Sequence, residues 1–260
     1  MSRTNFKELL DSGVHFGHLK KKWNPGMTPY VFMERNGIHI IDLNKTVSML
    51  DEAAAAMKQI AKSGRSILFV ATKKQAKTIV SEFAQSVNMP YITERWPGGL
   101  LTNFSTIRKS IKKMDIIDKM ATDGTLDTLS KRERLQISRT REKLDRNLGS
   151  IASMNRMPSA IFIVDINKEH IAVAEAAKLG IPTFAMVDTN SDPNQISYPI
   201  PSNDDSSKSI SKIMGIVTEA VKEGLADREQ ANAVKAQEKA DKKAAEAKKE
   251  ESTESTEKTK

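Results

Sequence analysis

The chain contains no cysteine, which excludes a disulfide framework and a thiolate metal site. Aromatic residues make up only 5% of the 260 residues, fewer than we expect for an enzyme with a deep apolar pocket. No apolar run approaches the roughly 20 residues that span a bilayer. Residues 1–13 mix charged and apolar side chains and predict a short amphipathic helix, unlike the apolar segment of a signal peptide. We therefore expect a protein of the cytosol.

The glycine motifs of nucleotide-binding enzymes are also absent. Residues 42–45 and 72–75 follow predicted strands, yet neither stretch has the spacing G-x-G-x-x-G or G-x-x-x-x-G-K-[ST]. Such glycines let the backbone approach a phosphate closely. The G-x-S-x-G and H-E-x-x-H motifs of hydrolases and metalloproteases are missing as well. These absences argue against a dinucleotide-binding or P-loop enzyme.

Positive charge is what the chain has in excess, and it is unevenly distributed. The formal net charge is +8, whereas residues 225–260 contain nine basic and nine acidic residues. The whole excess therefore lies in residues 1–224. Lysine and arginine that neutralise phosphates release counterions, so this excess suggests a polyanion such as RNA. A basic surface that only keeps the protein soluble is the alternative.

Apolar runs and helical periods alternate along the middle of the chain. Short runs rich in β-branched residues occupy residues 38–41, 67–71, 91–93, 160–164 and 183–187, and unbroken runs of this kind are typical of buried parallel strands. Helical periods are centred on Leu50, Ile79 and Ile213, and Gly64, Gly180 and Gly224 are placed to end helices. This alternation predicts an α/β protein with a parallel, doubly wound sheet flanked by helices.

Residues 105–154 show only helical pattern, interrupted near Asp123 and Gly124. Two narrow apolar seams predict an inserted antiparallel α-helical hairpin that packs as a coiled coil. Residues 105–149 contain twelve basic and seven acidic side chains, which favours an arm that reaches a partner. A solvated spacer is the alternative. We therefore expect a globular α/β domain of residues 1–104 and 155–224, the hairpin of residues 105–154, and a disordered charged tail of residues 225–260.

Two loops place tryptophan beside basic side chains. Lys20, Lys21 and Lys22 precede Trp23, and Arg95 precedes Trp96. The cations attract phosphate, while an indole either stacks on a base or packs beneath its loop. Lys73 and Lys74 begin a predicted helix, where charge and helix dipole both favour phosphate. The candidate RNA-binding residues are Lys20, Lys21, Lys22, Trp23, Lys73, Lys74, Arg95, Trp96, Arg108, Lys109, Lys112, Lys113, Arg132 and Arg139.

A histidine and several carboxylates lie where the loops of the sheet are expected. His15 and His18 lie three residues apart near the beginning of the chain, and Asp188, Asp192, Asp204 and Asp205 lie between the last predicted strand and the last helix. One imidazole with two or three carboxylates suits a divalent ion. Helix capping by the aspartates and a backbone hydrogen bond by the histidine are the alternative.

Several long segments resemble one known family. The segments LLDSGVHFGH (9–18), WNPGMTPYVFMERNGIHIIDLNKT (23–46), FVATKKQA (69–76), ERWPGGLLTNFSTI (94–107), AIFIVDINKEHIAVAEAAKLGIP (160–182) and DTNSDPNQISYPIPSNDD (188–205) resemble, in order, the bacterial small-subunit ribosomal proteins called S-two. The resemblance covers about residues 5–222.

The resemblance implies a Rossmann-like or flavodoxin-like domain with an inserted helical hairpin, and no catalytic residues. It implies binding to small-subunit ribosomal RNA and to other ribosomal proteins, among them the mRNA-binding protein S-one. It also implies that no cofactor is required, although some members of the family hold a divalent ion, zinc or magnesium. The positions that match the ligands of this ion are His18, Asp188, Asp204 and Asp205. A metal-dependent α/β enzyme that uses these four residues is the alternative, and a pure protein adaptor is another.

Overall fold

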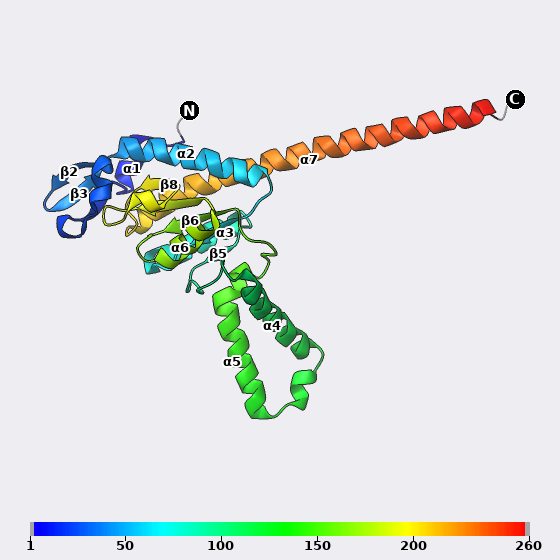
Figure 1. Ribbon diagram of the computed structural model, residues 1–260, viewed down its shortest axis with the longest axis horizontal. Helices are drawn as coiled ribbons and strands as arrows, with labels where there is room; N and C mark the ends of the chain where they lie inside the picture. The colour runs from blue at the N-terminus through cyan, green and yellow to red at the C-terminus, as the bar shows by residue number, and fades with distance from the viewer. Residues whose placement is uncertain (1–2, 258–260) are drawn as a thin grey trace.

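The computed structural model describes residues 3–257, and its centre is a five-stranded parallel sheet (Figure 1). The strands are β4 (Ile67–Val70), β5 (Tyr91–Ile92), β6 (Ala160–Val164), β7 (Thr183–Val187) and β8 (Tyr198–Pro201). They lie in the order β5-β4-β6-β7-β8, and every neighbouring pair is parallel. The second strand of this sheet thus lies outside the first, as in flavodoxin-like proteins. The predicted α/β class is confirmed.

A second, antiparallel sheet contains β1 (Phe16–Leu19), β2 (Val31–Arg35) and β3 (Ile38–Ile41) in the order β1-β3-β2. The prediction that residues 38–41 belong to the parallel sheet is therefore wrong. The reason is the turn between β2 and β3, where Asn36 and Gly37 have φ angles of 54° and 74°. Positive φ at both central residues gives the two-residue turn that joins antiparallel strands.

Helices cover both faces of the parallel sheet and enclose two apolar cores. On one face, α2 (Leu43–Lys62), α3 (Lys74–Ser86) and α7 (Ser207–Glu257) pack against Phe69, Phe162 and Phe184. On the other face, α6 (His170–Leu179) packs against the alternate side chains of the same strands. A short helix, α1 (Phe6–Asp11), precedes β1. Because β4, β6 and β7 are buried on both faces, they contain the unbroken apolar runs from which they were predicted.

Two helices project from the domain between β5 and β6 (Figure 1). They are α4 (Phe104–Thr122) and α5 (Lys131–Leu148), with the 3₁₀ segment η3 (Thr125–Thr128) between them and η4 (Gly149–Ile151) after them. Ser130 and Glu133 form a reciprocal capping box that begins α5. Arg141 of α5 donates to Asp118 of α4 over 2.9 Å. The root of both helices packs in the core on the α6 side of the sheet.

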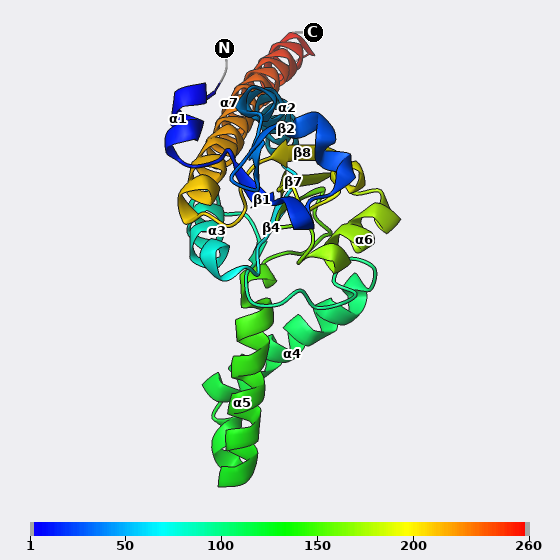
Figure 2. The same ribbon diagram turned by 90° about the vertical axis from the view of Figure 1, so that its left-hand side faces the viewer.

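Helix α7 runs beside α2 and continues far beyond the domain (Figures 1 and 2). Gly64 and Gly180 follow α2 and α6 with left-handed φ, as predicted, but α7 does not end at Gly224. A Cβ at residue 224 would collide with the carbonyl oxygen of Lys58 in α2, so this glycine serves close packing. The tail expected to be disordered is helical through Glu257, and residues 258–260 lie outside the described part. Alanine, lysine and glutamate are strong helix formers even without an apolar face.

Among the helices of the described residues, none has a stretch both long enough and apolar enough to cross a membrane.

Candidate functional site

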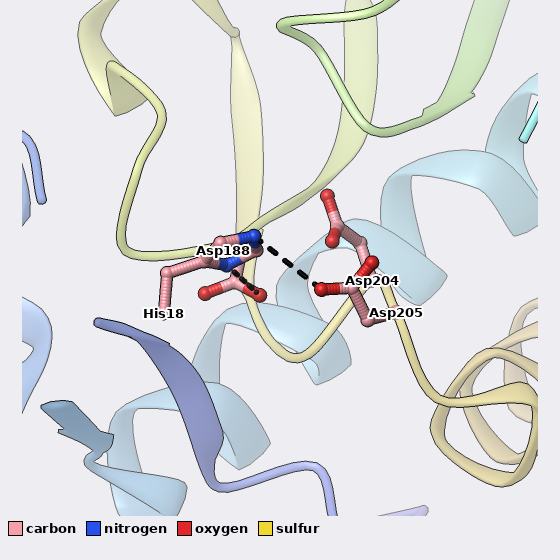
Figure 3. A group of neighbouring side chains, drawn as sticks. All are labelled: His18, Asp188, Asp204 and Asp205. Atoms are coloured by element: carbon pink, nitrogen blue, oxygen red, sulfur yellow. Dashed lines mark ion pairs between the residues drawn. The ribbon is translucent and has the colours of Figure 1, made fainter. Parts of the chain in front are cut away.

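The four predicted metal ligands lie together at the carboxyl edge of the parallel sheet (Figure 3). His18 comes from β1, Asp188 follows β7, and Asp204 and Asp205 follow β8. His18 Nδ1 lies 3.0 Å from Asp188 Oδ2, and its Nε2 lies 3.3 Å from Asp205 Oδ2. One potential ligand atom from each of the four residues falls within 4.8 Å of the others. Residues distant in the sequence thus form a single cluster.

His18 reaches the cluster because β1 packs tightly against the loop after β7. A Cβ on Gly17 would lie 2.6 Å from Thr189 Cγ2 and 2.9 Å from the carbonyl oxygen of His39. Only glycine fits this approach. The backbone N–H of His18 then donates to Thr189 Oγ1 over 2.8 Å. This loop therefore fixes both the backbone of His18 and, through Asp188, its imidazole.

Lys73 lies inside the cluster instead of on the surface. Its Nζ is 2.6 Å from Asp205, 2.8 Å from Asp204 and 3.3 Å from Asp165, and its side chain is 12% exposed. Burial alone would lower the pKa of Lys73, but the surrounding carboxylates raise it above its ordinary value. The ammonium group is therefore occupied by carboxylates and is poorly placed to meet an RNA phosphate.

The crevice at the switch point of the sheet is filled by the chain's own side chains. In flavodoxin-like sheets the strand order reverses at one point, and ligands bind there, outside the carboxyl ends of the two adjacent strands. Here the order reverses between β4 and β6. Lys73 follows β4 and pairs with Asp165, which follows β6. Glu169 accepts hydrogen bonds from the backbone N–H and the hydroxyl of Thr72. These contacts occupy the position where related folds hold a nucleotide.

The charge distribution of the cluster favours binding of a further cation. Asp204 is fully buried, and its Oδ2 has no hydrogen-bond partner among the described residues. Burial, together with Asp188 and Asp165 nearby, raises the pKa of Asp204 to about 7. The hydrogen bond that His18 donates to Asp188 raises the pKa of His18. A buried carboxylate oxygen that accepts no hydrogen bond therefore lies beside an imidazole and two more carboxylates. Together these side chains form a set of metal ligands that fits Zn²⁺ or Mg²⁺.

The loop of residues 20–23 presents exposed cations around a half-buried indole. Lys20, Lys21 and Lys22 form the 3₁₀ segment η1 (Lys20–Lys22), and all three are exposed. Lys20 pairs with Glu34 of β2 over 2.8 Å. The Trp23 ring lies 5.1 Å from the ring of His39. The loop thus presents three cations at the surface beside a half-buried indole that lies near His39.

The second tryptophan does not face solvent. Trp96 is 6% exposed, and its Nε1 donates to Glu175 of α6 over 3.1 Å. It packs in the core on the α6 side of the sheet, so it is an anchor of its loop and is unavailable for stacking on a base. Its neighbour Arg95 is exposed, as is Lys74 at the start of α3.

The basic residues predicted on the projecting helices are mostly at the surface. Lys109, Lys112 and Lys113 of α4 and Arg132 and Arg139 of α5 are exposed. Arg108 is half-buried, and its guanidinium donates to the carbonyl oxygen of Met154 over 3.1 Å.

The prediction missed Lys143. This residue lies with Arg132 and Arg139 around one shallow hollow of α5. The spacing of 7 and 4 residues along one helix face was the signal in the sequence.

An apolar pocket of about 380 Å³ lies between α1, β1, β2 and the start of α2. Phe6, Phe16, Phe32 and Met33 line it and are 49–68% exposed. The sequence did not reveal this pocket, because β1 and β2 were not predicted as strands. Exposed apolar surface rimmed by polar residues is typical of a binding site for another protein.

Comparison with known proteins decides the family. The model of the family described as "Ribosomal protein S2" matches residues 9–224. The chain belongs to the ribosomal protein S2 family. Its members include "Small ribosomal subunit protein uS2" of Parabacteroides distasonis, 66% identical over 88% of this chain and 82% of that protein. The protein of the same name from Flavobacterium johnsoniae is 64% identical over 92% of this chain and 94% of the relative.

Membership of the S2 family makes the chain a structural ribosomal protein and not an enzyme. The alternative of a metal-dependent enzyme built on His18 and the three aspartates is thereby set aside.

Proposed function

We propose that the chain is a structural component of the small ribosomal subunit in the cytoplasm. There it binds small-subunit ribosomal RNA and neighbouring ribosomal proteins during translation. The observation that carries the RNA proposal is the exposed basic surface of α4 and α5, which project from the domain (Figure 1). Lysine and arginine on such an arm attract phosphates, and folded RNA is recognised mostly by shape and backbone.

We also propose a division of the chain into a globular domain, a hairpin and a tail. Residues 1–104 and 155–224 form the globular domain, residues 105–154 form an antiparallel coiled-coil hairpin, and residues 225–260 form an appended charged tail. The hairpin is supported by the ion pair between Arg141 and Asp118 and by the buried seam residues Met114 and Ile117 of α4. A rigid paired arm would hold its basic side chains at a fixed distance from the domain.

The proposed RNA contacts are the exposed cations. Lys73 and Trp96 are left out because carboxylates hold both, whereas Trp23 and Arg108 are half-buried and border the exposed set. The set therefore keeps ten of the predicted residues and adds Lys143, the neighbour of Arg132 and Arg139 on α5. The ten are Lys20, Lys21, Lys22, Lys74, Arg95, Lys109, Lys112, Lys113, Arg132 and Arg139.

Filter binding of small-subunit ribosomal RNA across a salt series tests this proposal. The affinity of the unaltered chain should fall steeply with salt. The double variant Arg132→Ala/Arg139→Ala should lower the slope of log affinity against log salt by about 2, because two phosphate contacts are lost. The control variant Lys178→Ala/Lys208→Ala removes exposed lysines outside the proposed set and should keep the slope. A flat slope for the unaltered chain would refute RNA binding by this surface.

We further propose that the apolar pocket docks a protein partner, the mRNA-binding protein S-one. Four large apolar side chains converge there at high exposure, and burying one of them fully contributes roughly 1.5–3 kcal/mol. Phe32→Ser should therefore weaken retention of S-one on small subunits at least tenfold. The control Met157→Ser removes another exposed side chain far along the sequence and should retain S-one. Equal retention by both variants would count against this pocket.

We also propose that His18, Asp188, Asp204 and Asp205 hold one divalent ion, zinc or magnesium. A bound ion would neutralise the buried carboxylates and link β1 to the loops after β7 and β8. Zinc or magnesium added to the metal-free chain should raise the melting temperature by about 5 °C at saturation. Asp188→Asn should abolish the rise, whereas Asp192→Asn, outside the cluster, should keep it. Equal rises in both variants would exclude this site.

A further inference from the structure

The carboxylate of Glu175 is surrounded by hydrogen-bond donors from one loop. Its Oε1 accepts from Trp96 Nε1 over 3.1 Å and from the N–H of Gly99 over 2.7 Å. Its Oε2 accepts from the N–H of Leu101 over 3.0 Å, and from the N–H and the hydroxyl of Thr102 over 3.1 and 3.3 Å. Glu175 is 8% exposed. Five donors thus converge on one buried anion.

These donors keep Glu175 ionised inside the protein. Burial alone would raise the pKa of Glu175, but the bonds from Trp96, Gly99, Thr102 and Leu101 together hold it below its ordinary value. Among the described residues, no ion pair of Glu175 with a lysine or arginine is recorded. The backbone N–H groups of the loop therefore stabilise the negative charge of Glu175, as a cation does in an ion pair. Gly99, with a φ of +83°, supplies the left-handed turn of this loop.

The loop that Glu175 holds leads directly into α4. The last of its donors, Thr102, lies two residues before α4 begins at Phe104. Leu100 and Leu101 are buried in the same core as Ile111 of α4 and Leu148 of α5. In Figure 2 the segment leading into α4 passes below α6, the helix of Glu175. The loop is therefore the joint between the sheet layer and the projecting helices.

We propose that Glu175 is a positioning residue that fixes the direction in which α4 and α5 leave the domain. This inference rests on the proposed function, since the direction of the helices decides where their basic side chains meet RNA. A glutamine at this position has one acceptor oxygen, and its NH₂ group would face donors that it cannot satisfy. Losing acceptors for buried N–H groups would loosen the joint without removing any basic side chain.

Electron spin resonance on the full chain tests the direction itself. The chain has no cysteine, so Glu52→Cys on α2 and Ser138→Cys on α5 place two spin labels at exposed positions without competing sites. The doubly labelled parent should give a narrow distance distribution. Adding Glu175→Gln should broaden or shift the distribution. Adding the control Glu82→Gln, an exposed carboxylate on α3, should leave it unchanged.

A second variant covers the case in which Glu175→Gln fails to fold. Trp96→Phe removes only one of the five donors and should broaden the distribution less. If the folded variants keep the parent distribution, even with a lowered melting temperature, Glu175 is merely structural and the proposal is overturned.

An RNA-binding measurement separates this proposal from the one on which it rests. Glu175→Gln should weaken ribosomal RNA binding roughly tenfold while Glu82→Gln binds normally. A parent chain that binds no RNA would overturn the proposed function, and the distance distributions would still decide the role of Glu175. A broadened distribution with unchanged RNA affinity would support the role of Glu175 in setting the direction of α4 and α5, and would overturn the claim that this direction decides where their basic side chains meet RNA.

Discussion

At the scale of single residues, the ammonium group of Lys73 balances much of the negative charge at the carboxyl edge of the sheet. It contacts Asp165, Asp204 and Asp205. Removing one partner of a buried ion pair leaves uncompensated charge and costs about 3–5 kcal/mol. We expect Lys73→Met to lower the free energy of unfolding by about this amount in urea denaturation at pH 7. Lys74→Met, at the exposed neighbour, is the control, and an equal loss in both would contradict the role assigned to Lys73.

Glu223 gives a prediction about pH. Hydrogen bonds from Arg3 and Lys58 lower the pKa of Glu223 to about 2, from an ordinary value of 4.5. The carboxylate therefore stabilises the folded chain above pH 4.5, and this contribution is lost as the pH falls from 4.5 towards 2, because the unfolded chain takes up the proton first.

Thermal melts of the parent and of Glu223→Gln between pH 7 and pH 2.5 measure this loss. The difference in melting temperature should be greatest above pH 4.5 and should shrink below it. A difference that stays constant down to pH 2.5 would show that the ion pairs do not stabilise the fold.

The candidate site could be predicted only in part at this scale. The resemblance pointed to His18, Asp188, Asp204 and Asp205, and the structure brings them together. The placement of Lys73 was not predicted, because a lysine at a helix start carries the same local signal whether it faces solvent or a carboxylate. Asp165 directly follows a predicted strand, and carboxyl ends of parallel strands share one edge. That rule was the available hint that Lys73 has acidic neighbours.

At the scale of elements, the strands that contain a short apolar run could be predicted, whereas β1, β2 and β8 could not. Strands β4, β6 and β7 are unbroken apolar runs. Strand β8 contains Pro199 and Pro201, which hide the pattern and are tolerated because β8 lies at the edge of its sheet. Strands β1 and β2 are largely exposed, so neither alternation nor a continuous run marks them.

The packing of α7 on α2 supplies a prediction for one helix with its own control. Gly224→Ala would place a methyl group against the backbone of Lys58, and overpacking of this kind typically costs about 1–3 kcal/mol. Gly215 lies on the same helix, but a Cβ there would lie 3.9 Å from the ring of Phe83, an ordinary contact.

We expect Gly224→Ala to lower the free energy of unfolding. Gly215→Ala should raise it by up to about 1 kcal/mol, since alanine is the better helix former. Chemical denaturation of both variants checks the opposite signs, and a gain in stability at residue 224 would contradict the close packing.

At the scale of the whole molecule, the net positive charge that we propose attracts RNA lies outside the tail. Residues 231–260 contain eight basic and seven acidic residues, so they contribute almost no net charge. Deleting them should leave the salt dependence of ribosomal RNA binding unchanged within the error of the slope. The same filter-binding series measures this, and a slope reduced as much as in Arg132→Ala/Arg139→Ala would assign RNA contacts to the tail.

The insertion of α4 and α5 between β5 and β6 also affects the entropy of loop closure on folding. Strand β4 pairs with β6 across about ninety residues, of which these helices and their turns make up about half. The entropy of closing a loop grows only with the logarithm of its length, so doubling the loop adds about 0.6 kcal/mol. The sheet can therefore hold a long arm at small thermodynamic cost, and related chains can differ widely in arm length while keeping the same sheet.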